Sequence, residues 1–145
     1  MWFVGRRKKK LIVALHFQFS DQAGWECATC RKSGLETKRR CGWIPTAVET
    51  PVRVVWAKDS VATSMCPKSF VTAQSMAWVE EYLVRRRLGH RGIDGLGARE
   101  VEAFLILEHE LGKRDVDRSG GARRRATGTS DGLEQGASRV STRRT

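Results

Sequence analysis

The sequence contains few of the groups from which catalytic sites are usually built. Only three histidines occur in the chain, at positions 16, 90 and 109. Glu108-His109-Glu110 is similar to the start of a zinc-protease motif, but no histidine follows His109 by four residues. No Gly-rich phosphate loop follows a predicted strand, and no nucleophile elbow occurs. We therefore predict that the protein is not an enzyme.

Long apolar runs are equally scarce. Residues 11–15 follow a basic stretch and imitate the start of a signal peptide, but His16 and Gln18 interrupt the run and no small-x-small cleavage site follows. A helix that spans a bilayer needs about twenty apolar residues. We therefore expect a cytoplasmic protein without a membrane segment. In a reducing cytoplasm, free or metal-bound thiols are favoured over disulfides.

Acidic residues are scarce at both ends of the chain, whose net charge is +11. Residues 1–10 carry five cations and no acid, residues 112–145 carry nine cations and four acids, and residues 11–111 carry thirteen and twelve. The C-terminal segment also has too few large aliphatic side chains to offset the entropy of ordering. We predict a basic arm over 1–10, a folded domain over 11–111 and a disordered basic tail over 112–145. Such ends attract nucleic acid without specifying a sequence.

Four cysteines lie between positions 27 and 66, with the spacing C-x2-C-x10-C-x24-C. Two thiolates separated by two residues can face a common centre, and the other ligands of a tetrahedral zinc ion can come from distant parts of the chain. The sequence predicts a structural Zn²⁺ site formed by Cys27, Cys30, Cys41 and Cys66. A closed four-thiolate shell leaves no position for a substrate, so it does not suit catalysis. Free structural thiols and a redox-active Cys27/Cys30 pair are the alternatives.

Two further features bear on this predicted site. His16 could replace a cysteine as ligand, but alternation places it on the polar face of a predicted strand, which favours a solvated histidine. Residues 31–40 carry five cations and one acid. Because cations beside thiolates lower their pKa and offset the charge of a four-thiolate site, we expect a local electrostatic role for them. Contact with phosphates is the alternative.

The hydrophobic pattern predicts strands in the first half of the chain. Residues 11–19 form a continuous apolar run that passes into alternation, which is typical of a buried strand. Residues 52–57 and 60–64 are predicted to pair as a hairpin. This hairpin would turn the long interval between Cys41 and Cys66 into a short distance in space.

The second half is predicted to be helical. Residues 73–88 form one helix, with Ser69 and Thr72 as candidate N-caps and Gly89 as its C-terminal stop. Residues 98–111 form a second helix, which Gly112 ends. Its inward face is predicted to consist of Val101, Phe104, Leu105 and Leu111. The predicted fold is α+β, with a small zinc-ribbon-like hairpin unit followed by two helices and a disordered C-terminal tail.

The order of these motifs resembles a known group of proteins. The motifs are a strand over 11–19, Trp25-x-Cys27-x-x-Cys30, Arg40-Cys41-Gly42, Cys66-Pro67-Lys68-Ser69 and a late helix beginning at residue 98. Together they are similar to small zinc-ribbon-like proteins encoded in bacteriophage and prophage tail-gene regions. The resemblance covers about residues 11–111. It implies an accessory or chaperone-like protein of tail assembly that acts through protein contacts in the host cytoplasm, with both basic ends as peripheral additions.

These features together predict a zinc-stabilised module that binds another protein. Five tryptophans are many for a small domain, and tryptophan often anchors interfaces. Two or more tryptophans on one exposed patch would favour binding, whereas burial would make them core residues. The residues concerned are Trp25, Trp43, Trp56 and Trp78. The alternative is a nucleic-acid-binding zinc-ribbon protein, whose affinity would fall steeply with salt and survive removal of residues 113–145.

Overall fold

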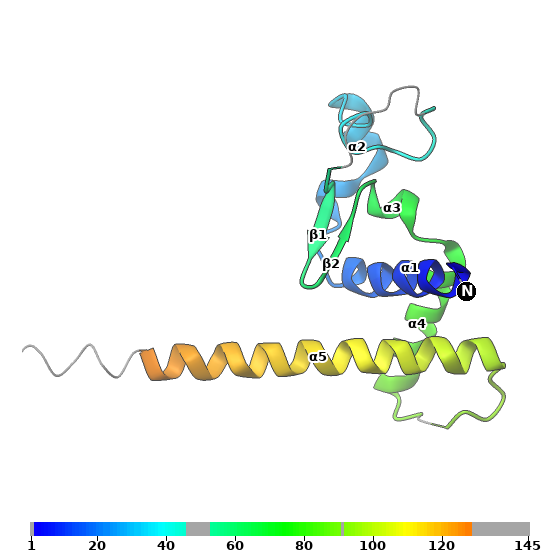
Figure 1. Ribbon diagram of the computed structural model, residues 1–145, viewed down its shortest axis with the longest axis vertical. Coiled ribbons are helices and arrows are strands. Elements are labelled where there is room, and N and C mark those ends of the chain that lie inside the picture. The colour runs from blue at the N-terminus through cyan, green and yellow to red at the C-terminus, as the bar shows by residue number, and fades with distance from the viewer. Residues whose placement is uncertain (1, 46–52, 91, 129–145) are drawn as a thin grey trace, which may run out of the picture. The chain divides into compact units, whose positions relative to one another are not determined.

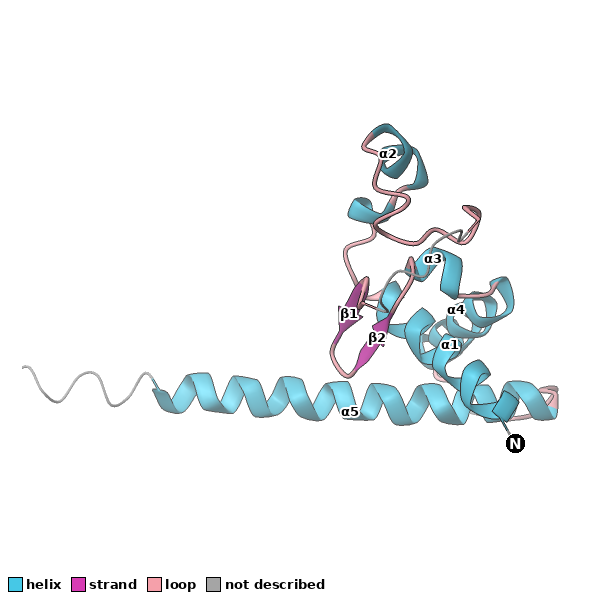
Figure 2. Cartoon of the chain, turned by 45° about the horizontal axis from the view of Figure 1, so that its top comes forward, coloured by secondary structure: helices cyan, strands magenta, loops and turns pink. Residues whose placement is uncertain are grey.

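A computed structural model describes residues 2–45, 53–90 and 92–128 of the chain (Figure 1). Helices predominate, and a single pair of short strands among the described residues completes a mixed α+β fold (Figure 2). The chain divides into two units, residues 1–109 and residues 110–145. In the part of the chain described here, no helix combines the length and apolar character needed to cross a membrane.

The elements follow one another in a simple order. They are α1 (Trp2–Gln18), a 3₁₀ turn (Ala23–Trp25), α2 (Cys27–Lys32), β1 (Trp56–Lys58), β2 (Val61–Thr63), α3 (Pro67–Phe70), α4 (Ala73–Arg87) and α5 (Ala98–Gly128). The helix α5 begins in the first unit and continues into the second.

The first element is a helix, so the strand predicted over residues 11–19 is wrong. The basic residues 6–10 form part of the same helix. A continuous apolar run does not by itself distinguish a strand from a helix that is buried on several sides. α1 contacts α3, α4 and β2, which explains why so much of its surface is apolar. Its buried aliphatic and aromatic side chains are Leu11, Val13, Ala14, Leu15 and Phe17.

The predicted hairpin is confirmed, although its strands are shorter than expected. β1 and β2 pair antiparallel, with Trp56 opposite Thr63 and Lys58 opposite Val61. Asp59 turns the chain with a φ of +51°, a left-handed conformation that aspartate tolerates better than most residues. The beginning of the predicted first strand falls within residues 46–52, outside the described residues.

A small apolar cluster fixes the hairpin to α1. It contains Val13 and Phe17 of α1 together with Trp56 and Val61 of the hairpin. The rings of Phe17 and Trp56 meet edge to face, with centroids 6.0 Å apart and planes at 75°. Because β2 ends three residues before Cys66, this packing also sets the position of that cysteine.

The helix predicted over residues 73–88 is confirmed as α4. The Thr72 side chain caps it by accepting a hydrogen bond from the backbone N–H of Ser75 at 3.2 Å. Gly89 follows its C-terminus with a φ of +76°, as a glycine stop requires. Val79 and Tyr82 are the large side chains that α4 buries.

The second predicted helix begins at Ala98 as expected, but it does not end at Gly112. α5 continues to Gly128, and residues 129–145 lie outside the described part. One glycine inside a helix costs only about 1 kcal/mol relative to alanine and stops a helix where it adopts positive φ. Gly112 does not adopt positive φ. In the second unit, Lys113 donates to Glu110 one turn earlier at 2.8 Å, which supports the helix there.

Candidate functional site

The four predicted ligand cysteines lie in short segments that meet in the first unit. Cys27 begins α2 and Cys30 lies within it, so the Cys-x-x-Cys pair sits on a helical turn. Cys41 follows a series of turns, and Cys66 immediately precedes α3. Cys30, Cys41 and Cys66 are buried, whereas Cys27 is exposed, and all four carry free thiols.

Cys41 lies beside the other cysteines. Burial raises the pKa of the Cys41 thiol, and the charges of Cys66, Cys30 and Cys27 and a hydrogen bond with the Cys66 side chain act in the same direction. Charges have this effect only at short range, so the four side chains share one neighbourhood. The expected lowering of thiol pKa by nearby cations is therefore wrong at Cys41, because desolvation and the neighbouring thiols dominate there.

An independent backbone contact joins the segments that carry Cys41 and Cys66. The N–H of Gly42 donates to the hydroxyl of Ser69 in α3 at 3.0 Å. A β-carbon on Gly42 would lie 3.2 Å from that of Ser69, so the close approach favours glycine. This contact holds the Cys41 turn against the first turn of α3.

The four free cysteines form the donor set of the predicted zinc site. Among residues 2–45, 53–90 and 92–128, no group of three or more His, Cys, Asp or Glu side chains is placed to hold a metal ion. The donor set itself suits zinc, since four thiolates form one of the usual structural zinc shells. Burial of three of the four also matches a closed structural site more closely than an open catalytic one.

Arg39 of the cationic stretch 31–40 makes three local contacts. The Arg39 guanidinium donates to the sulfur of Cys30 at 2.9 Å and to the carbonyl of Gly24 at 2.6 Å. It also lies 4.3 Å from the ring centroid of Trp25, within the range of a cation–π contact. A cation is thus held directly against one of the cysteines.

The four tryptophans considered above differ in how far their side chains are exposed to solvent. Arg31 lies 4.9 Å from the ring centroid of Trp43, which is 55% exposed. Trp56 is buried in the α1–hairpin cluster, and Trp25 and Trp78 are half-buried. One of these four tryptophans is therefore exposed. They do not form an exposed patch of two or more, and they are not all buried.

His16 is not a solvated histidine. It is 1% exposed on α1, and its Nδ1 donates to the Asp59 carboxylate in the hairpin turn at 2.9 Å. The prediction failed because it assumed the two-residue period of a strand, which does not apply in a helix. The contact ties α1 to the tip of the hairpin.

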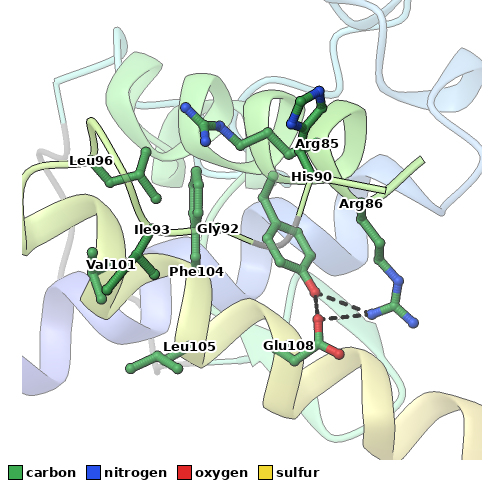
Figure 3. A pocket seen from close by; sticks show the side chains of 11 residues that line it. Arg85, Arg86, His90, Gly92, Ile93, Leu96, Val101, Phe104, Leu105 and Glu108 are labelled. Carbon is green, nitrogen blue, oxygen red and sulfur yellow. Dashed lines mark hydrogen bonds and ion pairs between the residues drawn. The ribbon is translucent and has the colours of Figure 1, made fainter. Parts of the chain in front are cut away.

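A cavity of about 320 Å³ lies between α4, the loop that follows it and the first part of α5. Figure 3 shows Leu96, Ile93 and Val101 near Phe104 on one side, and Arg86 joined to Glu108 on the other. The Phe104 ring also packs against Tyr82, with centroids 5.5 Å apart. Apolar side chains therefore line one side of the cavity and polar side chains line the other.

A hydrogen-bonded trio closes the polar side of this cavity. The hydroxyl of Tyr82, the side chain of Arg86 and the carboxylate of Glu108 interact mutually, with Tyr82 donating to Glu108 and Arg86 donating to both. Burial raises the pKa of Tyr82, the hydrogen bond to Glu108 raises it further, and the hydrogen bond from Arg86 lowers it. At neutral pH the trio thus holds a protonated phenol between α4 and α5.

Because Tyr82 is the only tyrosine in the chain, its titration can be measured directly by the ultraviolet absorbance of the phenolate. We expect Glu108→Gln to lower the Tyr82 pKa and Arg86→Gln to raise it, since these changes remove opposite charges. A raised folded-state pKa stabilises the fold below the ordinary value of about 10, and this stabilisation is lost as pH rises through the folded pKa. As a control, Glu81→Gln, which removes the partner of Arg85, should leave the titration unchanged. An equal shift from Glu81→Gln and Glu108→Gln would contradict the trio.

Sequence reasoning missed this cavity and its trio. It left Glu108 without a role beside His109 and placed Leu105 on the inward face, whereas Leu105 is 67% exposed at the cavity rim. Ala103 and Leu107 are buried in its place. The sequence did contain an indication of this packing, because residues 101 and 104–107 are all apolar. Such a continuous run allows more than one face of the helix to be buried.

No protein family, curated protein or solved structure matches this chain.

Proposed function

We propose that this protein is a non-enzymatic, zinc-stabilised module that binds another protein, as an accessory or chaperone-like factor of phage tail assembly. The observation that carries the zinc part is the gathering of four cysteines from α2, the Cys41 turn and the start of α3. Zinc would be held by Cys27, Cys30, Cys41 and Cys66. Its role would be to cross-link these segments, in which short elements bury little apolar surface. The hairpin between the third and fourth cysteines would then be part of a zinc-ribbon-like unit.

The cavity between α4 and α5 supports the binding part of the proposal. Two large aliphatic side chains that line it, Ile93 and Leu105, are more than half exposed. Exposed apolar side chains that gather around a concavity are typical of protein interaction sites. The two rim arginines are each paired with a carboxylate, Arg85 with Glu81 and Arg86 with Glu108. We therefore propose that the cavity receives an apolar segment of the partner protein.

The contacts of residues 31–40 favour this function over the nucleic-acid-binding alternative. Arg31 and Arg39 are stacked on Trp43 and Trp25, and Arg39 is further engaged by Cys30. Cations held in this way support the local fold, and the tryptophan faces they cover are not free to stack on bases.

Site-specific photo-crosslinking tests the proposal. A photoreactive amino acid at Leu105 is expected to give a discrete adduct with a protein in the cells that naturally produce the chain. Val116 provides a matched control, because it lies on the same helix and is 69% exposed compared with 67% for Leu105, but does not line the cavity. Equal adduct yields at the two positions would mean that the cavity does not direct binding. Adducts with nucleic acid alone would favour the alternative function.

A further inference from the structure

A second cavity of about 290 Å³ lies in the first unit, among α1, α4 and the beginning of α5. Its apolar lining comes from Leu11, Trp78, Ala103 and Ile106. Three basic side chains also line it, Arg7 and Lys8 from α1 and Arg99 from α5. Neither the predicted zinc site nor the proposed partner-binding cavity uses these basic residues.

The charge of this cavity is not balanced from within. Its three cations are accompanied by one acid, Glu102, so the lining carries a net charge of +2. Within the described part of the chain, none of Arg7, Lys8 and Arg99 takes part in a hydrogen bond or an ion pair. The other cavity differs in this respect, because its two arginines are both paired with glutamates. Unpaired cations around an apolar hollow favour a bound anion.

Trp78 contributes an aromatic ring to the lining of the same cavity. The indole ring provides a flat apolar surface on which a ligand body can lie.

We infer that this second cavity binds a small organic anion, in which one acidic group is attached to an apolar, preferably flat, body. The acidic group would lie among Arg7, Lys8 and Arg99, and the apolar body would lie against Trp78 and Ile106. The volume is close to the lower limit of about 300 Å³ for small-molecule pockets, so the ligand is small. This inference does not depend on zinc or on a protein partner.

Two fluorescent probes that differ only in charge test the inference on the full chain. Anilinonaphthalene sulfonate carries a sulfonate on an aromatic body, and N-phenylnaphthylamine is the same body without the sulfonate. We expect one molecule of the sulfonate probe to bind per chain, about 10-fold more tightly than the neutral probe. Its affinity should fall as the salt concentration is raised. Equal affinity for both probes would overturn the inference, because the cavity would then select only for apolar character.

Substitutions locate the bound probe. Arg99→Gln and Arg7→Gln each remove one exposed cation. Each is expected to lower the affinity for the sulfonate probe by about 3- to 10-fold and to leave the affinity for the neutral probe unchanged. Arg85→Gln in the other cavity is the matched control and should have no effect. A larger loss from Arg85→Gln than from Arg99→Gln would overturn the assignment.

Discussion

Replacing Cys66 with serine is expected to remove the zinc ion that we propose the native chain carries. A serine hydroxyl does not supply the thiolate that a structural site needs, and one of the three remaining cysteines, Cys27, is exposed to solvent. Structural zinc contributes about 10–16 kcal/mol in zinc-finger peptides, so its loss should also lower the melting temperature sharply. Native mass spectrometry with and without a chelator measures the bound metal, and thermal unfolding measures the stability.

The matched control for this change is Ser64→Ala, an exposed position two residues before Cys66. It should leave both metal content and melting temperature unchanged. If the Cys66→Ser variant keeps its full complement of zinc, Cys66 is not an obligatory ligand. If the native chain carries no metal, the four cysteines are free thiols or contain a redox pair, and the zinc part of the proposal fails.

Features governed by local chemistry could be predicted from the sequence. Thr72 caps α4 because its hydroxyl reaches the backbone three residues ahead, and Gly89 ends α4 because it accepts a positive φ. The hairpin follows from two short apolar segments around a polar turn. In each case the residues that determine the structure are neighbours in the sequence.

Features that depend on distant neighbours could not be predicted in the same way. The run 11–15 is helical because α1 is covered from several sides, which no local pattern reveals. The Tyr82–Glu108 contact joins residues 26 positions apart and depends on how α4 and α5 face each other. The apolar run at 104–107 likewise left the inward face of α5 undetermined until the packing of the first unit was known.

The candidate site shows the same division between local and distant effects. The spacing of the cysteines led to the prediction that Cys66 returns to Cys41, and the structure places these two side chains together. The second cavity, in contrast, takes Arg7 from one end of the first unit and Arg99 from the other. Neither arginine is singled out by the sequence, because Arg7 is one of five consecutive cations and Arg99 lies on a helix surface, where isolated cations are common.

The second large effect is expected in the core of the first unit, where Leu107 is fully buried on α5. Leu107→Ala should reduce the free energy of unfolding by about 2–5 kcal/mol, since it removes apolar contacts and leaves a cavity. Leu105→Ala is the matched change, because the same substitution is made two residues away on the same helix. At 67% exposure, Leu105 should contribute no more than about 0.5 kcal/mol.

Urea unfolding of the two variants therefore decides which face of α5 is packed. A large cost at Leu105 and a small one at Leu107 would show that the helix is rotated toward the face expected from the sequence pattern. The expected result has a further consequence for function. Because Leu105 lines the cavity rim without supporting the core, Leu105→Ala should weaken attachment of the partner while leaving the fold intact. Leu107→Ala should reduce attachment only to the extent that it unfolds the chain.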